Sequence, residues 1–195
     1  DLPTVTLAGV EIEAENFTFT SAVDDLYSWE TVGDTLVAGM SNGLAIQASP
    51  GDSVESFKDD YETLAPSSSY VVNFEEAGTY YFYFRANSLA SGDKNSCHFG
   101  VSDGTDTTTY TRVEFDEDID TWQWGNVLKS DDTVSYEVTE PGMHELIIWV
   151  REIGIVMDKF MISGEKDLAL DVTGVSLDPT TATVDVGSTV QLAAT

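Results

Sequence analysis

The amino-acid sequence predicts an all-β fold, an antiparallel β-sandwich of the jelly-roll kind. Helical periodicity is almost absent, whereas short runs of β-branched and aromatic residues recur along the chain, bounded by Gly, Asp, Asn, Ser and Pro. The 195 residues are 42% hydrophobic, which is ordinary for a globular protein, so the acidity of the chain does not indicate disorder.

Ten strands are expected in chain order. Gly-containing segments such as "EEAGTY" (75–80) and "TEPGMHEL" (139–146) are typical of tight turns between them. In the run 78–86, Tyr80, Phe82 and Phe84 alternate with Tyr81, Tyr83 and Arg85, so one of these two faces must belong to the core. The expected strands are 9–15, 43–49, 69–74, 78–86, 96–102, 109–115, 121–127, 133–139, 142–152 and 155–163.

The composition of the sequence changes after these strands. We therefore divide the chain into a sandwich module (1–163), a linker (164–174) and a last segment (175–195). The last segment has no aromatic residue and is rich in Thr and Val. It resembles the first strands of a bacterial Ig-like domain of group 2, of which it holds about a quarter; a Thr-rich tail is the alternative. The residues that carry this resemblance are Val175, Leu177, Pro179, Val184, Val186, Gly187 and Leu192.

The charge of the chain excludes several kinds of partner. Against 35 Asp+Glu stand only 8 Lys+Arg, a formal net charge of −27. Phosphate binding needs a basic face, so we expect no nucleic-acid partner and no anionic membrane partner. The apolar runs, such as "LIIWV", are far shorter than the roughly 20 residues of a membrane helix. The single cysteine, Cys97, allows no internal disulfide.

Several segments resemble, in the same order, the calcium-dependent carbohydrate-binding modules of families 6 and 35, which have a galactose-binding-like β-sandwich. The resemblance covers about residues 10–163. One departure is Ile153, where a subgroup of these modules often has an acidic residue after "RE". The segments are "IEAENF" (12–17), "MSNGLAIQASPG" (40–51), "AGTYYFYFRANS" (77–88), "KNSCHFGVSDG" (94–104), "TWQW" (121–124), "PGMHELIIWVREIG" (141–154) and "REIGIVMDKFMIS" (151–163).

Three carboxylates are candidate metal ligands. Glu13 and Glu15 are two residues apart on an expected strand and share a face, where like charges repel unless a cation intervenes. Asp158 lies inside the apolar run "IVMDKFMI", where a free carboxylate is costly. If the first and last strands pair, as the resemblance implies, the three carboxylates converge on a structural Ca²⁺. The alternative is a solvated edge face in an acidic protein.

The motif "TWQW" raises the question of whether its tryptophans are core or a platform for a sugar ring. We expect Trp124 to pack in the core and Trp122, which is nearer the loop "DEDID" (116–120), to be the platform. Sugar hydroxyls would be bound by polar side chains around it. The resemblance places Arg85, Asn87, Asn95 and Asp103 in this role.

Two further aromatic residues, Tyr27 and Trp29, are second-rank candidates for ligand contact, because they lie in the expected first long loop. The strand face opposite the core is a second ligand position in modules of this kind. His98 and His144 stand singly within strands, without partners at metal-ligand spacing, so core or surface roles are favoured for both.

The resemblance implies a non-catalytic polysaccharide-binding module of a secreted bacterial protein. Such a module would direct an attached glycoside hydrolase or lyase to a plant or algal polysaccharide. The motifs G-x-S-x-G, H-E-x-x-H and the P-loop are absent from the sequence, so we do not expect an enzyme. Two alternatives stay open: a calcium-stabilised adhesive or structural module without sugar affinity, and an all-β polysaccharide-degrading enzyme.

Overall fold

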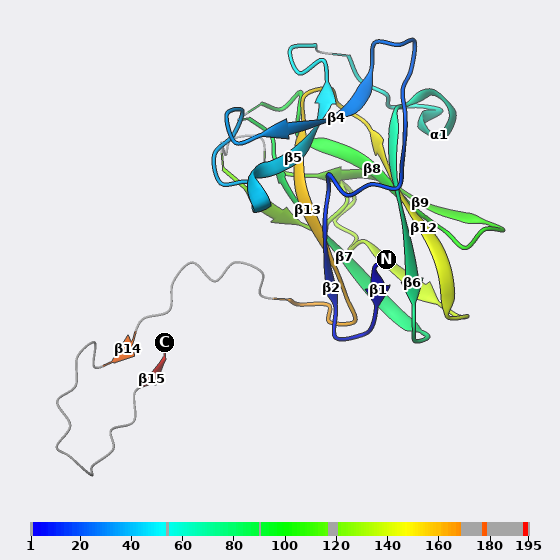
Figure 1. Ribbon diagram of the computed structural model, residues 1–195. Coiled ribbons are helices and arrows are strands. Elements are labelled where there is room, and N and C mark those ends of the chain that lie inside the picture. The colour runs from blue at the N-terminus through cyan, green and yellow to red at the C-terminus, as the bar shows by residue number, and fades with distance from the viewer. Residues whose placement is uncertain are drawn as a thin grey trace.

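The computed structural model describes residues 2–53, 55–89, 91–116, 121–168, 177–178 and 193–194. Within them the chain forms two facing β-sheets with very little helix, which confirms the predicted antiparallel β-sandwich (Figure 1). The helical pieces are a single turn at Ser41–Gly43 and the short helix α1 (Tyr61–Leu64).

The first sheet has the strand order β1-β6-β12-β8-β9, and β3 also pairs with β6. Its pairs are antiparallel except β1 with β6, which run parallel. Its strands are β1 (Thr4–Val5), β3 (Phe19–Ser21), β6 (Ser67–Phe74), β8 (Ser96–Ser102), β9 (Thr107–Glu114) and β12 (Gly142–Val150).

The second sheet has the order β10-β7-β13-β5-β4, while β11 also pairs with β7 and β2 also pairs with β13. Every expected strand therefore has a counterpart in the structure, and β1, β3 and β4 are additional. The strands of this sheet are β2 (Val10–Glu13), β4 (Ser28–Gly33), β5 (Leu44–Ser49), β7 (Gly78–Asn87), β10 (Gln123–Gly125), β11 (Ser135–Val138) and β13 (Val156–Ser163).

The core lies between the sheets and is aromatic. Tyr80, Phe82 and Phe84 of β7 are fully buried, so this face of the strand is the core face. Phe99 of the first sheet packs against Phe82 and Phe84, with ring centroids 4.8 Å and 5.0 Å apart. Burial of each such side chain contributes about 2–3 kcal/mol of hydrophobic free energy, so this layer holds the two sheets together.

Trp29 is part of this core, and the prediction that it lies in a ligand-contacting loop is wrong. It belongs to β4, is 3% exposed, and its indole Nε1 donates a hydrogen bond to the carbonyl of Ile148 in the opposite sheet, at 3.1 Å. The run "SWETV" has the β-branched and aromatic composition of a strand, which is the signal that identifies β4 in the sequence.

The expected linker begins on the surface of the sandwich. After β13, the Gly164 amide donates to the carbonyl of Leu7 at 3.0 Å. The hydroxyl of Tyr83, on the outer face of β7, donates to the carbonyl of Glu165 at 2.9 Å. The Ig-like prediction for residues 175–195 falls almost wholly outside the described residues. Within that segment the structure describes only β14 (Leu177–Asp178) and β15 (Ala193–Ala194), which pair antiparallel.

Candidate functional site

Pairing of β2 with β13 brings the predicted metal ligands into one region. Glu13 lies opposite Lys159 in the ladder, and the amide of Ala14 donates to the carbonyl of Asp158 at 2.9 Å. The register of β13 against β7 shifts between Met157 and Lys159, so Asp158 is the extra residue of a β-bulge. Because of the bulge, the fully buried side chain of Asp158 does not follow the regular alternation of its neighbours on β13.

Hydrogen bonds from the segment 38–42 hold two of these carboxylates. Asp158 Oδ1 accepts from the backbone amide of Ser41 at 2.6 Å, and Oδ2 forms an ion pair with the guanidinium of Arg85. Glu13 Oε1 accepts from Ser41 Oγ at 2.7 Å and from Asn42 Nδ2 at 3.0 Å. Ser41 and Asn42 are site residues that the sequence analysis did not single out, although Ser and Asn in a Gly-rich stretch are typical loop ligands.

Among the residues that the structure describes, two buried carboxylate oxygens have no hydrogen-bond donor, namely Oε2 of Glu13 and Oε2 of Glu15. Burial raises the pKa of the Glu15 carboxyl, and the charges of Glu13 and Asp158 raise it further. An unpaired buried acceptor costs about 1–3 kcal/mol and a charged one costs more. The donor set therefore fits a hard cation, since carboxylate oxygens are the ligands that Ca²⁺ prefers.

The carboxylates are not arranged as a finished metal site in this structure. Among the described residues, no group of three or more His, Cys, Asp or Glu side chains is placed to hold a metal ion. Arg85 neutralises Asp158 instead, and its own side chain is 21% exposed. Arg85 is thus the group with which a bound cation would share Asp158.

Arg85, which pairs with Asp158, also contacts Trp122. The Arg85 guanidinium is 4.9 Å from the centroid of the indole ring, within cation–π distance, and also donates to the carbonyl of Gly39 at 3.2 Å. The indole Nε1 donates to the carbonyl of Ala38 at 2.9 Å. Trp122 also packs against the hydrophobic cluster of Met40, Ala45 and Val156, and it is half-buried, so only part of its side chain is open to solvent.

Trp124 is not a core residue, contrary to the prediction. Its position on β10 is opposite Arg85 of β7, which places it on the outer face of the second sheet, where it is half-buried. The Nζ atom of Lys159 lies 5.8 Å from its ring centroid. The inner positions of the neighbouring strand are filled by Phe84 and Ala86, which are fully buried.

The two predicted amide ligands, Asn87 and Asn95, are buried and do not reach the surface. Asn87 is 0% exposed and accepts from the amide of Leu89 at 2.7 Å, while its Nδ2 has no partner in the described part of the chain. Asn95 is 2% exposed and donates to the carbonyl of Phe115 at 3.0 Å, while its Oδ1 meets no partner within the described ranges. Both amides therefore form hydrogen bonds within buried loops and do not reach the surface around Trp122, where sugar hydroxyls were predicted to bind.

The remaining candidates lie elsewhere. Asp103 stands in the turn between β8 and β9, where its Oδ1 accepts from the amides of Thr105 and Asp106 at 2.7 Å and 2.9 Å. These bonds lower the pKa of the Asp103 carboxyl. Tyr27 is half-buried, with its ring edge-on to Phe57 at 5.5 Å. Of the predicted saccharide ligands, the structure thus brings together only Trp122 and Arg85.

Comparison with known proteins gives a family match over most of the chain. The family model described as the glycosyl hydrolase family 115 C-terminal domain matches residues 8–169. An uncharacterised protein of Formosa agariphila is 29% identical over 102 residues, which cover 49% of this chain and 24% of that protein. The chain thus spans about a quarter of the length of this curated relative.

Solved structures share the fold at low sequence identity. A family 35 carbohydrate-binding module from Clostridium thermocellum has a TM-score of 0.52 at 14% identity and covers 80% of this chain and 97% of its own. The C-terminal family 6 module of a marine laminarinase from Zobellia galactanivorans has a TM-score of 0.50 at 14% identity, covering 80% and 98%. In the described part of the chain, no helix is long and apolar enough to cross a membrane.

Proposed function

The chain belongs to the glycosyl hydrolase family 115 C-terminal domain family, and we propose that it is a non-catalytic module that binds polysaccharide. The observation that carries the proposal is Trp122. Its indole is anchored through Nε1 and flanked by Arg85, yet part of the ring remains at the surface. A sugar ring stacks its C–H face on such an indole, and a neighbouring guanidinium donates hydrogen bonds to the sugar oxygens.

The family description suggests what the module is attached to. A domain at the C-terminal end of a glycosyl hydrolase shares a chain with a catalytic domain. Binding to an insoluble polymer would keep that catalytic domain near its substrate and raise the effective concentration of cleavable bonds. We therefore propose a secreted bacterial protein that is directed to plant or algal polysaccharide.

The charge of the chain favours an uncharged polymer. With a formal net charge of −27, a sulfated or otherwise anionic polysaccharide would be repelled at long range. Two of the solved modules with this fold are attached to, or derived from, enzymes named for laminarin and for β-1,4-mannan, which are neutral glycans. Neutral glucans, xylans and mannans are accordingly the first polymers to test.

We further propose that Glu13, Glu15 and Asp158 hold a Ca²⁺ ion that stabilises the module. Support comes from the two buried carboxylate oxygens without donors, which a divalent cation would satisfy. Because the ligands come from β2 and from the bulge in β13, the ion would link the first and last strands of the second sheet. Its role would be to favour the folded chain and not to perform chemistry.

Affinity electrophoresis tests the function directly. The chain is run through gels cast with xylan, β-glucan, galactomannan, agar, alginate or carrageenan, with and without EDTA. We expect retardation by one or more neutral polymers, and at least a ten-fold loss of retention in Trp122→Ala. Trp124→Ala is the matched control, since Trp124 is also a half-buried indole beside a cation but lies on the sheet face.

Retention that survives Trp122→Ala but is lost in Trp124→Ala would move the site to the sheet face. If no polymer retards the chain while EDTA still lowers its melting temperature, the adhesive or structural alternative is correct. Release of reducing sugar from any of the polymers by the purified chain would contradict the non-catalytic assignment.

A further inference from the structure

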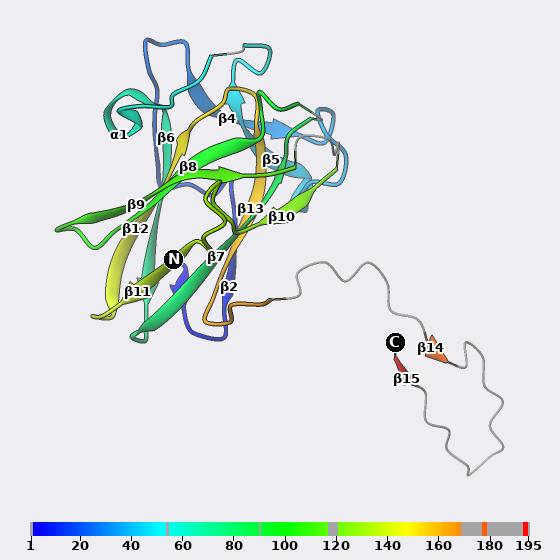
Figure 2. The ribbon, with the colours of Figure 1, turned by 180° about the vertical axis from the view of Figure 1, so that it is seen from behind.

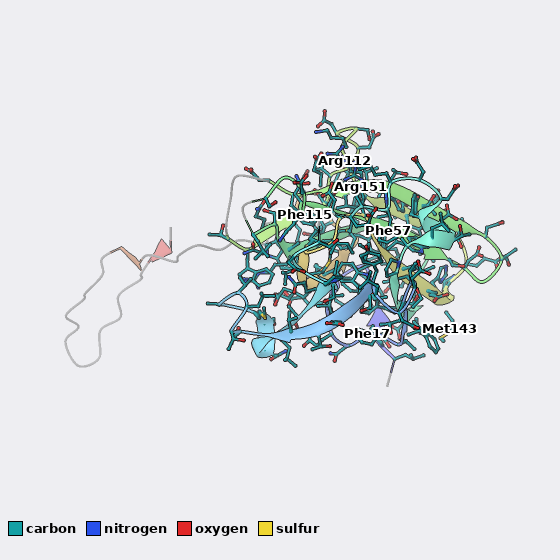
Figure 3. All side chains as sticks on the ribbon, turned by 90° about the horizontal axis from the view of Figure 1, so that it is seen from above. Phe17, Phe57, Arg112, Phe115, Met143 and Arg151 are labelled. Atoms are coloured by element: carbon teal, nitrogen blue, oxygen red, sulfur yellow. The ribbon has the colours of Figure 1, made fainter. Side chains whose placement is uncertain are left out.

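A cavity opens at the end of the sandwich formed by the β8–β9 and β11–β12 turns. It has a volume of about 270 Å³, and its lining includes Asp103, Thr105, Tyr136, Glu140, Met143 and His144. In Figure 2 this turn of β8 and β9 and the start of β10 lie on opposite sides of the molecule. Figure 3 likewise shows Met143 at one edge and Phe115, beside the Asn95 amide, toward the other.

His144 gives this cavity a hydrogen-bond acceptor on a largely buried side chain. The residue is only 6% exposed, and its Nδ1 lies 3.1 Å from the carbonyl oxygen of Gly142. A carbonyl can only accept, so Nδ1 carries the hydrogen and Nε2 of the neutral ring carries a lone pair. Among the described residues Nε2 has no partner, so it is the nitrogen left for a group that enters the cavity.

Two aromatic neighbours fix the orientation of this imidazole. Phe74 is edge-on to it at 5.1 Å, and Tyr136, itself part of the cavity wall, is edge-on at 5.8 Å. His144 is on β12 of the first sheet and Tyr136 is on β11 of the second. The cavity is therefore built from both sheets at the point where they separate, and its walls are held by the core.

The other polar groups of the lining are acceptors and hydroxyls. Oδ1 of Asp103 is occupied by two backbone amides, which leaves Oδ2 for a ligand. The hydroxyl of Tyr136 has no hydrogen-bond partner among the described residues, and the charge of Asp103 contributes to the raised pKa of Tyr136 after burial. Glu140 adds a second carboxylate, and no Lys or Arg lines the cavity.

From this chemistry we propose that the cavity binds one uncharged sugar residue, as a second saccharide site separate from Trp122. The carboxylates and the imidazole lone pair accept hydrogen bonds from sugar hydroxyls, and the hydroxyl of Tyr136 donates or accepts. Uronates and sulfated sugars are excluded, because no cation offsets the two carboxylates. The inference shares with the proposed function only the class of ligand.

Two separated sites would make one module bivalent. A single polysaccharide chain could be held at both sites, or two neighbouring chains could be bridged. Binding to a polymer would then exceed binding to a short oligosaccharide by roughly 10²–10⁴-fold, which is the range that multivalency provides.

Imidazole ¹⁵N NMR provides the test, because the chain has only two histidines. The labelled full-length chain is titrated with cellotriose, xylotriose and mannotriose, and separately with trigalacturonate and CaCl₂. We expect a neutral trisaccharide to shift the Nε2 resonance of His144. His98 is the internal reference, since both its ring nitrogens are already bonded, to the Phe57 carbonyl and the Arg112 amide.

Variants separate the two sites. Asp103→Asn keeps the acceptor of the turn but removes the charge, and we expect it to weaken the His144 response about ten-fold. Trp122→Ala should leave the His144 response intact, with its fold checked by the unchanged His98 signals. If a trisaccharide changes the tryptophan emission of the native chain but not that of Trp122→Ala, while His144 stays silent, the second site is overturned and the proposed function stands.

Other results also decide the question. A His144 shift that appears with trigalacturonate or CaCl₂ and with no neutral sugar overturns the proposed ligand class. A His144 shift in the absence of any response at Trp122 supports the cavity and contradicts the site proposed above. Silence of both residues toward all three neutral trisaccharides overturns both.

Discussion

His98 shows how one buried side chain ties stability to pH. It is fully buried in β8, its ring is stacked on Tyr61 at 3.8 Å, and Nδ1 accepts a hydrogen bond from the amide of Arg112 at 3.1 Å. Burial lowers the pKa of His98 to about 4, and the nearby charge of Arg151 acts in the same direction. Protonation would also remove the acceptor that the Arg112 amide uses.

The unfolded chain therefore binds a proton between about pH 6.5 and pH 4 that the folded chain does not bind. The contribution of His98 to stability falls as the pH falls through this window, by roughly 3 kcal/mol. Urea unfolding at a series of pH values checks this, with His98→Gln expected to flatten the slope. His144→Gln is the control and should keep the slope of the native chain; an equal flattening in both variants would contradict the assignment to His98.

At the scale of elements, the segment 38–42 joins the carboxylate cluster to Trp122. The carbonyl of Ala38 holds the indole and the carbonyl of Gly39 holds Arg85, while Ser41 binds Asp158 and Glu13. Arg85 touches both ends of this arrangement. A cation at the carboxylates is consequently expected to affect the proposed saccharide site without contacting the sugar.

Chelation tests this coupling. We expect EDTA to lower the melting temperature by several degrees, to change the emission of Trp122 and to reduce polysaccharide retention several-fold. Asp158→Asn, which preserves the shape of the side chain, should abolish all three effects. Glu11→Gln is the matched control, because Glu11 pairs with Lys159 on the same ladder but at the surface, and it should keep the full response to EDTA. A full EDTA effect in Asp158→Asn would rule out the proposed ligand.

The sequence is sufficient to predict some of these elements and not others. Alternation in β7 identifies its core face because side chains of a strand point to opposite faces with a period of two. Asp158 is recognisable in the sequence as the one carboxylate inside the apolar run "IVMDKFMI". The ion pair of Asp158 with Arg85 is not recognisable in the sequence, because 73 residues separate the partners and a β-bulge determines the contact. Asn87 and Asn95 are buried by loops whose paths depend on tertiary packing, which local patterns do not encode.

For the molecule as a whole, the dominant property is its charge. A formal net charge of −27 on 195 residues produces self-repulsion that opposes folding. Added salt screens this repulsion, because the Debye length falls from about 30 Å at 0.01 M to about 3 Å at 1 M.

We therefore expect the melting temperature to rise by several degrees between 0.02 M and 0.5 M NaCl. Retention by a neutral polysaccharide should remain nearly constant over the same range, since stacking and hydrogen bonds do not depend on screened charge. Calorimetry and affinity electrophoresis at matched salt concentrations measure the two quantities. A retention that collapses as salt increases would indicate binding by ion pairs and contradict the proposed neutral ligand.

The pairing of β2 with β13 also has a mechanical consequence. Val10 lies opposite Ile162, whereas Glu13 lies opposite Lys159, so the chain enters β2 and leaves β13 at the same end of the ladder. A force applied through both flanking segments loads the backbone hydrogen bonds one after another, as in unzipping, and not all together, as in shear. The carboxylate cluster stands at the far end of this ladder, where a bound cation would resist the last step of the peeling. In the proposed role of tethering an enzyme to a solid polymer, this ladder would begin to open at the Val10–Ile162 end at modest tension, while the strands around Asp158 hold until the end.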